Sequence, residues 1–133
     1  MKKLMISFLF IVLVAGCNQK SIKHNKDLEE SIFSIVEDEN NSEISVGALT
    51  DFEWDQAFLF EPYTPEEQME KELGVEFEDP SNLRSRDDIY LLVFMDDGKV
   101  IQYAEVDRQG SDFSIGGVEY LTPEQDVIEI SRD

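Results

Sequence analysis

The apolar residues between positions 27 and 38 repeat with the period of a helix. They recur three and four positions apart and so share one helical face: Leu28, Ile32, Ile35 and Val36. Asp27 can cap this helix, and Glu30 completes a capping box. We therefore predict a helix over 27–38, with a strand over 31–36 as the competing interpretation.

A second helix is predicted from the residues that can begin and end it. Thr64 can cap the first turn, Pro65 suits the first helical position, and Gly74 can adopt the left-handed conformation that ends a helix. Met69 and Leu73 are four residues apart and would share the face toward the core. The helix is therefore expected to end at Leu73.

The pattern from residue 89 to residue 106 predicts a β-hairpin. Residues 89–95 are apolar without alternation, which indicates a central strand covered on both faces. Asp96-Asp97-Gly98 follows, and Asp-Gly is a strong hairpin signal because glycine accepts a positive φ angle. Residues 99–106 then return as the partner strand.

The rest of the pattern predicts shorter strands separated by polar loops. We expect strands at 43–49, 54–60, 118–121 and 127–130, polar loops at 76–88 and 107–117, and a short helical turn at 122–125. Together the elements predict a single small α+β domain. Its two short helices would pack on an antiparallel sheet of about four or five strands.

Charge divides the chain into a basic and an acidic part. Residues 27–133 hold all 30 acidic residues and six basic ones, a net charge of −24, whereas residues 18–26 hold three lysines and no acid. We interpret 17–26 as a basic stalk, which anionic lipid headgroups would attract, and 27–133 as an acidic domain. A stalk without an electrostatic role is the alternative. The acidic domain would repel phosphates, so we expect no nucleic acid as a partner.

Residues 1–16 have the layout of a secretory signal peptide. A basic start precedes an apolar stretch over 4–15, which is too short to cross a bilayer. The run Val14-Ala15-Gly16-Cys17 resembles the lipobox of bacterial lipoproteins. The resemblance implies cleavage before Cys17 and a diacylglyceryl group on it, which would hold the protein on the extracytoplasmic face of the cell membrane. An ordinary signal peptide with a coincidental cysteine is the alternative.

Few residues in the sequence point to catalysis. Cys17 is the only cysteine, and its lipidation leaves no thiol for catalysis or for a disulfide. The only histidine, His24, falls in the predicted stalk, away from any rigidly held nucleophile. We therefore expect no enzyme activity, no cofactor and no Cys/His zinc site.

The abundant carboxylates leave two chemical alternatives open. The acidic runs at 76–79, 87–88 and 96–97 could hold Ca²⁺, or two of their carboxyls could act as acid and base. None of the runs has the spacing of an EF-hand loop, and 96–97 is explained by the hairpin. Because charged side chains usually lie on the surface, we expect a solvated surface at each run.

Aromatic residues crowd into a segment of twelve residues, 52–63: Phe52, Trp54, Phe58, Phe60 and Tyr63. Rings of this size usually fill the core of a small domain, and we favour that interpretation. The alternative is a ligand groove or an anchor for a binding partner, because aromatic side chains often anchor interfaces.

Several short motifs stand together in most of residues 50–130: Trp54-Asp55, Pro62-Tyr63-Thr64, Leu73-Gly74, Leu91-Leu92-Val93-Phe94 and, in the return strand, Tyr103. They resemble a group of small uncharacterised lipoproteins of Gram-positive bacteria, which implies a shared fold but no activity or site residue. We therefore expect a membrane-anchored protein that acts by binding an envelope protein. A Ca²⁺-binding envelope module is the alternative, and a small carboxylate-dependent enzyme is a third hypothesis.

Overall fold

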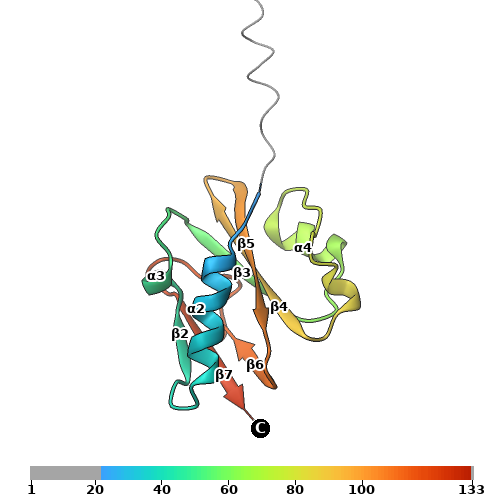
Figure 1. Ribbon diagram of the computed structural model, residues 1–133. Coiled ribbons are helices and arrows are strands. Elements are labelled where there is room, and N and C mark those ends of the chain that lie inside the picture. The colour runs from blue at the N-terminus through green and yellow to red at the C-terminus, as the bar shows by residue number, and fades with distance from the viewer. Residues whose placement is uncertain (1–21, 133) are drawn as a thin grey trace, which may run out of the picture.

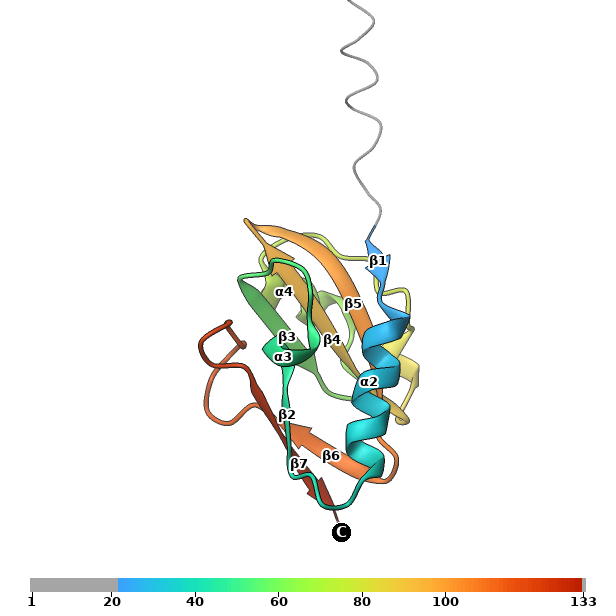
Figure 2. The same ribbon diagram turned by 60° about the vertical axis from the view of Figure 1, so that its left-hand side comes forward.

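Two β-sheets and their covering helices make up the structure, a computed structural model that describes residues 22–132 (Figures 1 and 2). One sheet has the strand order β1-β5-β4-β3 and the other the order β2-β7-β6. The elements are β1 (Lys23–His24), α2 (Lys26–Glu37), β2 (Glu43–Ser45), α3 (Val46–Leu49), β3 (Gln56–Phe60), α4 (Glu66–Leu73), the 3-10 helix η2 (Leu83–Ser85), β4 (Ile89–Asp96), β5 (Lys99–Asp107), β6 (Ser111–Ser114) and β7 (Val127–Arg132). The predicted α+β class is confirmed, with the strands divided over two sheets.

Strand β4 separates two hydrophobic cores. Alternate β4 side chains belong to the first core, namely Tyr90, Leu92 and Phe94, and the others belong to the second, namely Ile89, Leu91, Val93 and Met95. The first core lies among the four-stranded sheet, α2 and the three-stranded sheet, whereas the second includes side chains of α4 and of the loop before β4. Because both faces of β4 are covered, an unbroken apolar run suits it, and the predicted central strand is confirmed.

Strands β4 and β5 form the predicted hairpin. Asp96 pairs with Lys99, and the two residues between them, Asp97 and Gly98, have φ angles of 54° and 78°. Positive φ at both central positions defines a type I′ turn, whose twist matches that of the flanking strands. The Asp-Gly signal therefore located this turn correctly.

Helix α2 confirms the first predicted helix but has a different cap. The side-chain oxygen of Asn25, not that of Asp27, accepts a hydrogen bond at 3.0 Å from the backbone N–H of Leu28. Leu28, Ile32 and Val36 are buried along one face of the helix. The competing interpretation of a strand over 31–36 is therefore wrong.

Folded structure begins before the predicted domain boundary at Asp27. Strand β1 pairs in parallel with β5, with His24 opposite Tyr103, and Asn25 is only 7% exposed. His24 is therefore part of the domain, and the prediction that it lies in a stalk is wrong. The local sequence could not show this, because the pairing joins residues almost eighty positions apart.

The predicted signal peptide, Cys17 and the first part of the predicted stalk lie outside the described residues. Within residues 22–132, no helix is both long enough and apolar enough to cross a membrane.

Helix α4 has the predicted end but not the predicted cap. Gly74 has a φ angle of 80°, and its N–H donates to the carbonyl of Glu70 at 2.8 Å. The hydroxyl of Thr64 does not cap the helix; it donates to the carbonyl of Glu61 at 2.6 Å. Thr64 therefore closes the turn between β3 and α4.

The predicted strand over 43–49 is wrong in its second half. Strand β2 ends at Ser45, and the chain turns into the short helix α3. Asp126 causes this change, because its carboxylate accepts hydrogen bonds from the Ser45 hydroxyl at 3.1 Å and from the Gly47 N–H at 2.6 Å. A residue distant in sequence therefore ends the strand.

Four other predicted segments also differ from the structure. The loop over 107–117 contains β6, which pairs with β7. In the loop over 76–88, Phe77 and Leu83 are buried in the second core. The strand over 118–121 is reduced to one bridge at Leu121, and 122–125 forms a tight turn closed by Thr122 and Gln125. The first three of these segments are shaped by contacts with distant parts of the chain, whereas the turn at 122–125 is closed by local hydrogen bonds.

Candidate functional site

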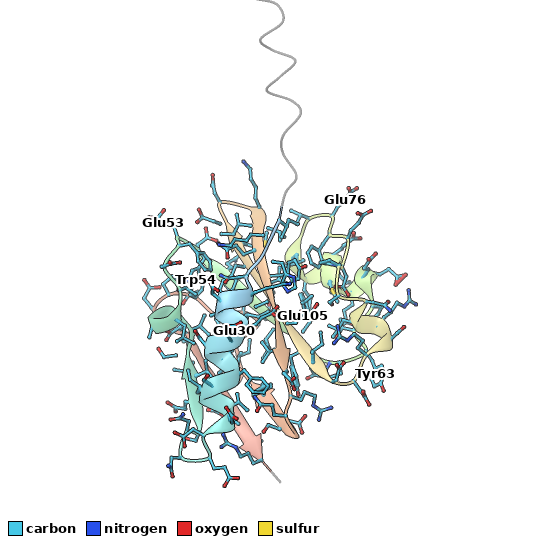
Figure 3. All side chains as sticks on the ribbon, viewed as in Figure 1. Glu30, Glu53, Trp54, Tyr63, Glu76 and Glu105 are labelled. Atoms are coloured by element: carbon cyan, nitrogen blue, oxygen red, sulfur yellow. The ribbon has the colours of Figure 1, made fainter. Side chains whose placement is uncertain are left out.

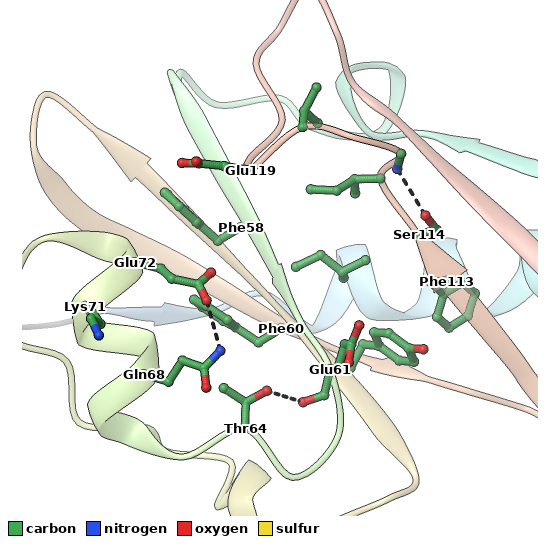
Figure 4. Close-up of a pocket in the computed structure, with 15 residues that line it drawn as sticks. Phe58, Phe60, Glu61, Thr64, Gln68, Lys71, Glu72, Phe113, Ser114 and Glu119 are labelled. Carbon is green, nitrogen blue, oxygen red and sulfur yellow. Dashed lines mark hydrogen bonds between the residues drawn. The ribbon is translucent and has the colours of Figure 1, made fainter.

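A hollow of about 710 Å³ lies along the free edge of strand β3 (Figure 4). Helix α4 forms one wall, and the chain from Phe113 to Glu119 forms the other. The residues that line it come from four parts of the sequence: Phe58, Leu59, Phe60, Glu61, Thr64, Gln68, Lys71, Glu72, Tyr90, Phe113, Ser114, Ile115, Gly116, Val118 and Glu119. Segments far apart in the chain therefore enclose one surface.

The backbone of β3 offers unpaired polar groups to this hollow. Strand β3 is the last in its sheet, with β4 on its inner side. On the outer side, Ala57 exchanges two backbone hydrogen bonds with Leu121, at 2.9 and 2.8 Å. Peptide groups two residues apart in a strand point the same way, so the N–H and C=O of Leu59 also point outward. Among residues 22–132, no strand pairs with the edge at Leu59.

Buried aromatic side chains form the base of this hollow. Phe58 and Phe60 stack with ring centroids 6.1 Å apart, and Phe58 also lies 5.2 Å from the ring of Tyr120. Phe58 and Phe60 are 4% and 3% exposed, and Trp54 is buried in the first core. The interpretation of the aromatic segment as core is thus confirmed for these three rings, although two of them also line the hollow.

Tyr63 is the exception within the aromatic segment 52–63, because 60% of it is exposed (Figure 3). Its φ angle of 70° is uncommon for a residue other than glycine. Its backbone N–H donates to the carbonyls of Leu83 and Arg86, at 3.0 and 3.2 Å, and these bonds hold the conformation. The turn that leaves β3 is therefore attached to the loop before β4.

The walls of the hollow carry an excess of negative charge. Three of the lining residues are acidic, Glu61, Glu72 and Glu119, and one is basic, Lys71. Figure 4 shows Glu72 and Glu119 on the same side of β3 as Phe58, with the Glu72 carboxylate accepting a hydrogen bond from Gln68 at 3.2 Å. This arrangement favours a ligand with positive charge.

The acidic runs singled out in the sequence lie elsewhere. Glu76, Glu78, Asp87 and Asp88 are all exposed, and none lines the hollow. Asp88 makes two hydrogen bonds with the guanidinium of Arg86, at 2.8 and 2.9 Å, and these lower the pKa of the Asp88 carboxyl. Within the described part of the chain, no three His, Cys, Asp or Glu side chains are placed to hold a metal ion.

Asp79, also in an acidic run, has a structural role in the loop before β4. Its carboxylate accepts hydrogen bonds from the backbone N–H and hydroxyl of Ser81, at 2.8 and 2.6 Å, and from the N–H of Leu83 at 2.8 Å. These bonds order the turn that places Leu83 in the second core.

His24 joins three elements at the opposite edge of the sheet. Its Nε2 lies 2.5 Å from the carboxylate of Glu29 on α2, and its ring stacks on Tyr103 of β5 at 4.5 Å. Glu29 also accepts a hydrogen bond from the N–H of Glu105 at 2.8 Å. Burial raises the pKa of Tyr103, and the nearby carboxylates of Glu105, Glu29 and Asp79 add to the effect. These contacts fasten β1 and α2 to β5.

The aromatic residues at the base of the hollow stand out in the sequence, although they are interpreted as core, whereas the walls give no local signal. Gln68, Lys71 and Glu72 lie on α4, whereas Ser114 and Glu119 come some fifty residues later. Each of these residues is an ordinary polar surface residue by its local pattern. The folded chain alone brings them together around β3.

Comparisons of this chain with protein families, with curated proteins and with solved structures find no match. Residues 22–132 form a small acidic α+β domain with a hollow along the outer edge of strand β3.

Proposed function

We propose that this protein is a lipoprotein, anchored through Cys17 on the extracytoplasmic face of the cell membrane, that acts by binding an envelope protein. The hollow along β3 is the observation that carries the binding role. It combines outward backbone groups at Leu59, apolar side chains and an acidic wall. Binding sites for other proteins commonly combine an apolar centre with polar groups that fix orientation.

The position of the hollow relative to the start of the domain supports this proposal. Strand β1, which continues from the proposed anchor, lies at one edge of the four-stranded sheet, and β3 lies at the other. The hollow therefore opens on the sheet edge opposite β1. A partner bound there would not contact β1, the first described strand after the proposed anchor.

Replacing the anchor residue tests the first half of the proposal. We expect Cys17→Ser to block lipidation, so that the protein leaves the membrane fraction or stays unprocessed with its signal peptide. Fractionation of cells followed by mass measurement of the protein would distinguish these results. Processed Cys17→Ser protein that stays in the membrane fraction contradicts the lipoprotein assignment.

Site-specific photo-crosslinking in intact cells tests the binding half. A photoreactive residue in place of Gln68, which is exposed on the wall of the hollow, should give a discrete crosslinked protein. The matched control is Glu30, which is exposed on α2 and does not line the hollow. Equal crosslinking at both positions, or none at Gln68, contradicts a partner in the hollow.

A further inference from the structure

The geometry points to an extended peptide segment as the occupant of the hollow. In this segment basic and apolar residues alternate, and its backbone pairs with β3 at Leu59 as an added strand. This inference rests on the proposed function and specifies the chemistry of the partner. Its three supports are the free backbone edge, the two kinds of side chain beside it and the charge of the walls.

The backbone supplies the first support. The outer edge of β3 already forms a backbone-bonded pair at Ala57, where Leu121 occupies the position of a neighbouring strand. Leu59 presents the next outward N–H and C=O groups, and the hollow lies beside them. Extended peptides bind exposed sheet edges in this way, with main-chain hydrogen bonds for affinity and alternate side chains for specificity.

The side chains beside the edge supply the second support. Successive side chains of an added strand would point to opposite faces of the sheet. On the face of Phe58, they would meet Glu72 and Glu119 (Figure 4). On the other face, Leu59 and Ile115 pack as half-buried apolar side chains against the first core. Lysine or arginine suits the first face, and a β-branched residue suits the second.

Charge selects this occupant over a second copy of the chain. Two copies paired edge to edge would bring two sets of Glu61, Glu72 and Glu119 together, and residues 27–133 of each copy carry a net charge of −24. Like charges brought together in an interface oppose association. A basic segment instead gains from the same carboxylates.

The test uses a short synthetic peptide in which lysine and valine alternate, and the mature chain with Cys17→Ser. We expect the peptide to bind and to slow hydrogen exchange at the Leu59 amide, as measured by NMR, because that N–H would enter the new pairing. A peptide with the same side chains but N-methylated at the alternate residues whose N–H groups would face β3 should not bind, because it lacks the donors for the new pairing. Binding without protection of Leu59, or equal binding of both peptides, overturns the strand pairing.

A charge variant and its control test the role of the acidic wall. The triple change Glu61→Gln, Glu72→Gln and Glu119→Gln should raise the Kd of the peptide about tenfold, since each exposed pair contributes modestly. The control, Glu30→Gln, Glu37→Gln and Glu39→Gln, removes the same charge from exposed positions outside the hollow and should change the Kd much less. Equal losses in the two variants overturn the assignment of the acidic wall.

The failure of this inference can be distinguished from the failure of the proposed function. If the peptide does not bind but position 68 still crosslinks to a protein in cells, strand addition is wrong and the binding role stands. If neither is observed, both are wrong.

Discussion

Replacing Phe94 with alanine is expected to lower the free energy of unfolding by about 3–5 kcal/mol, the cost of truncating a fully buried phenylalanine. Phe94 lies in the central strand β4 and is 0% exposed. Its ring makes edge contacts with Phe52 at 5.0 Å and with Trp54 at 5.4 Å. Truncation would leave a cavity in the first core, between β4 and the segment before β3.

Urea denaturation of the mature chain with Cys17→Ser, followed by Trp54 fluorescence, measures this loss. The control is Phe33→Ala on helix α2, because Phe33 is 41% exposed and its ring lies outside both cores. That variant should change the free energy of unfolding by less than about 0.5 kcal/mol. Similar losses in the two variants would contradict the placement of Phe94 at the centre of the core.

Asn25→Ala is expected to lower the free energy of unfolding by about 2–4 kcal/mol, because two interactions of one buried side chain are lost together. Its oxygen caps α2 at the N–H of Leu28, and its Nδ2 donates to the side-chain oxygen of Gln102 at 2.8 Å. Both Asn25 and Gln102 are buried, so the alanine variant leaves a buried acceptor without its donor.

The comparison variant for this prediction is Asp27→Ala. Asp27 is exposed in the first turn of α2, where its charge favours the helix by less than about 1 kcal/mol. Urea denaturation should therefore separate the two variants clearly. A larger loss for Asp27→Ala would show that the cap lies where the sequence pattern placed it and not at Asn25.

The caps illustrate why local patterns located the helices better than their N-terminal capping residues. The spacing of apolar residues predicted α2, because burial of one helical face dominates the choice of structure. Helix α4 was predicted from the residues that can begin and end a helix, supported by the spacing of Met69 and Leu73. Capping depends on which polar group the tertiary structure leaves available. Thr64 is engaged with the carbonyl of Glu61, only three residues earlier, so a local turn competes for this cap. Asn25 is held in place by the distant Gln102, so its role as a cap does not follow from local sequence.

The candidate site was predictable only in part, for the same reason. The aromatic segment gave a visible signal because large apolar side chains crowd together. The open edge of β3 gave none, since whether a strand lies at an edge depends on which other strands pair with it. Leu121 pairs with the edge of β3 at Ala57, and no pairing continues to Leu59 within residues 22–132. Leu121 lies more than sixty residues further along the chain than Ala57.

By itself, the sequence determined the α+β class, the central strand, the hairpin turn at Asp97-Gly98 and the helix end at Gly74. These features follow from local rules: apolar periodicity, and backbone angles that few residues adopt without strain. The tertiary structure alone decided that His24 belongs to the fold, that Asp126 ends β2 and that α4 and residues 113–119 enclose the edge of β3. Each of these three features depends on contacts between residues that are distant in the sequence. The local sequence pattern around either residue does not indicate which distant residue it will contact.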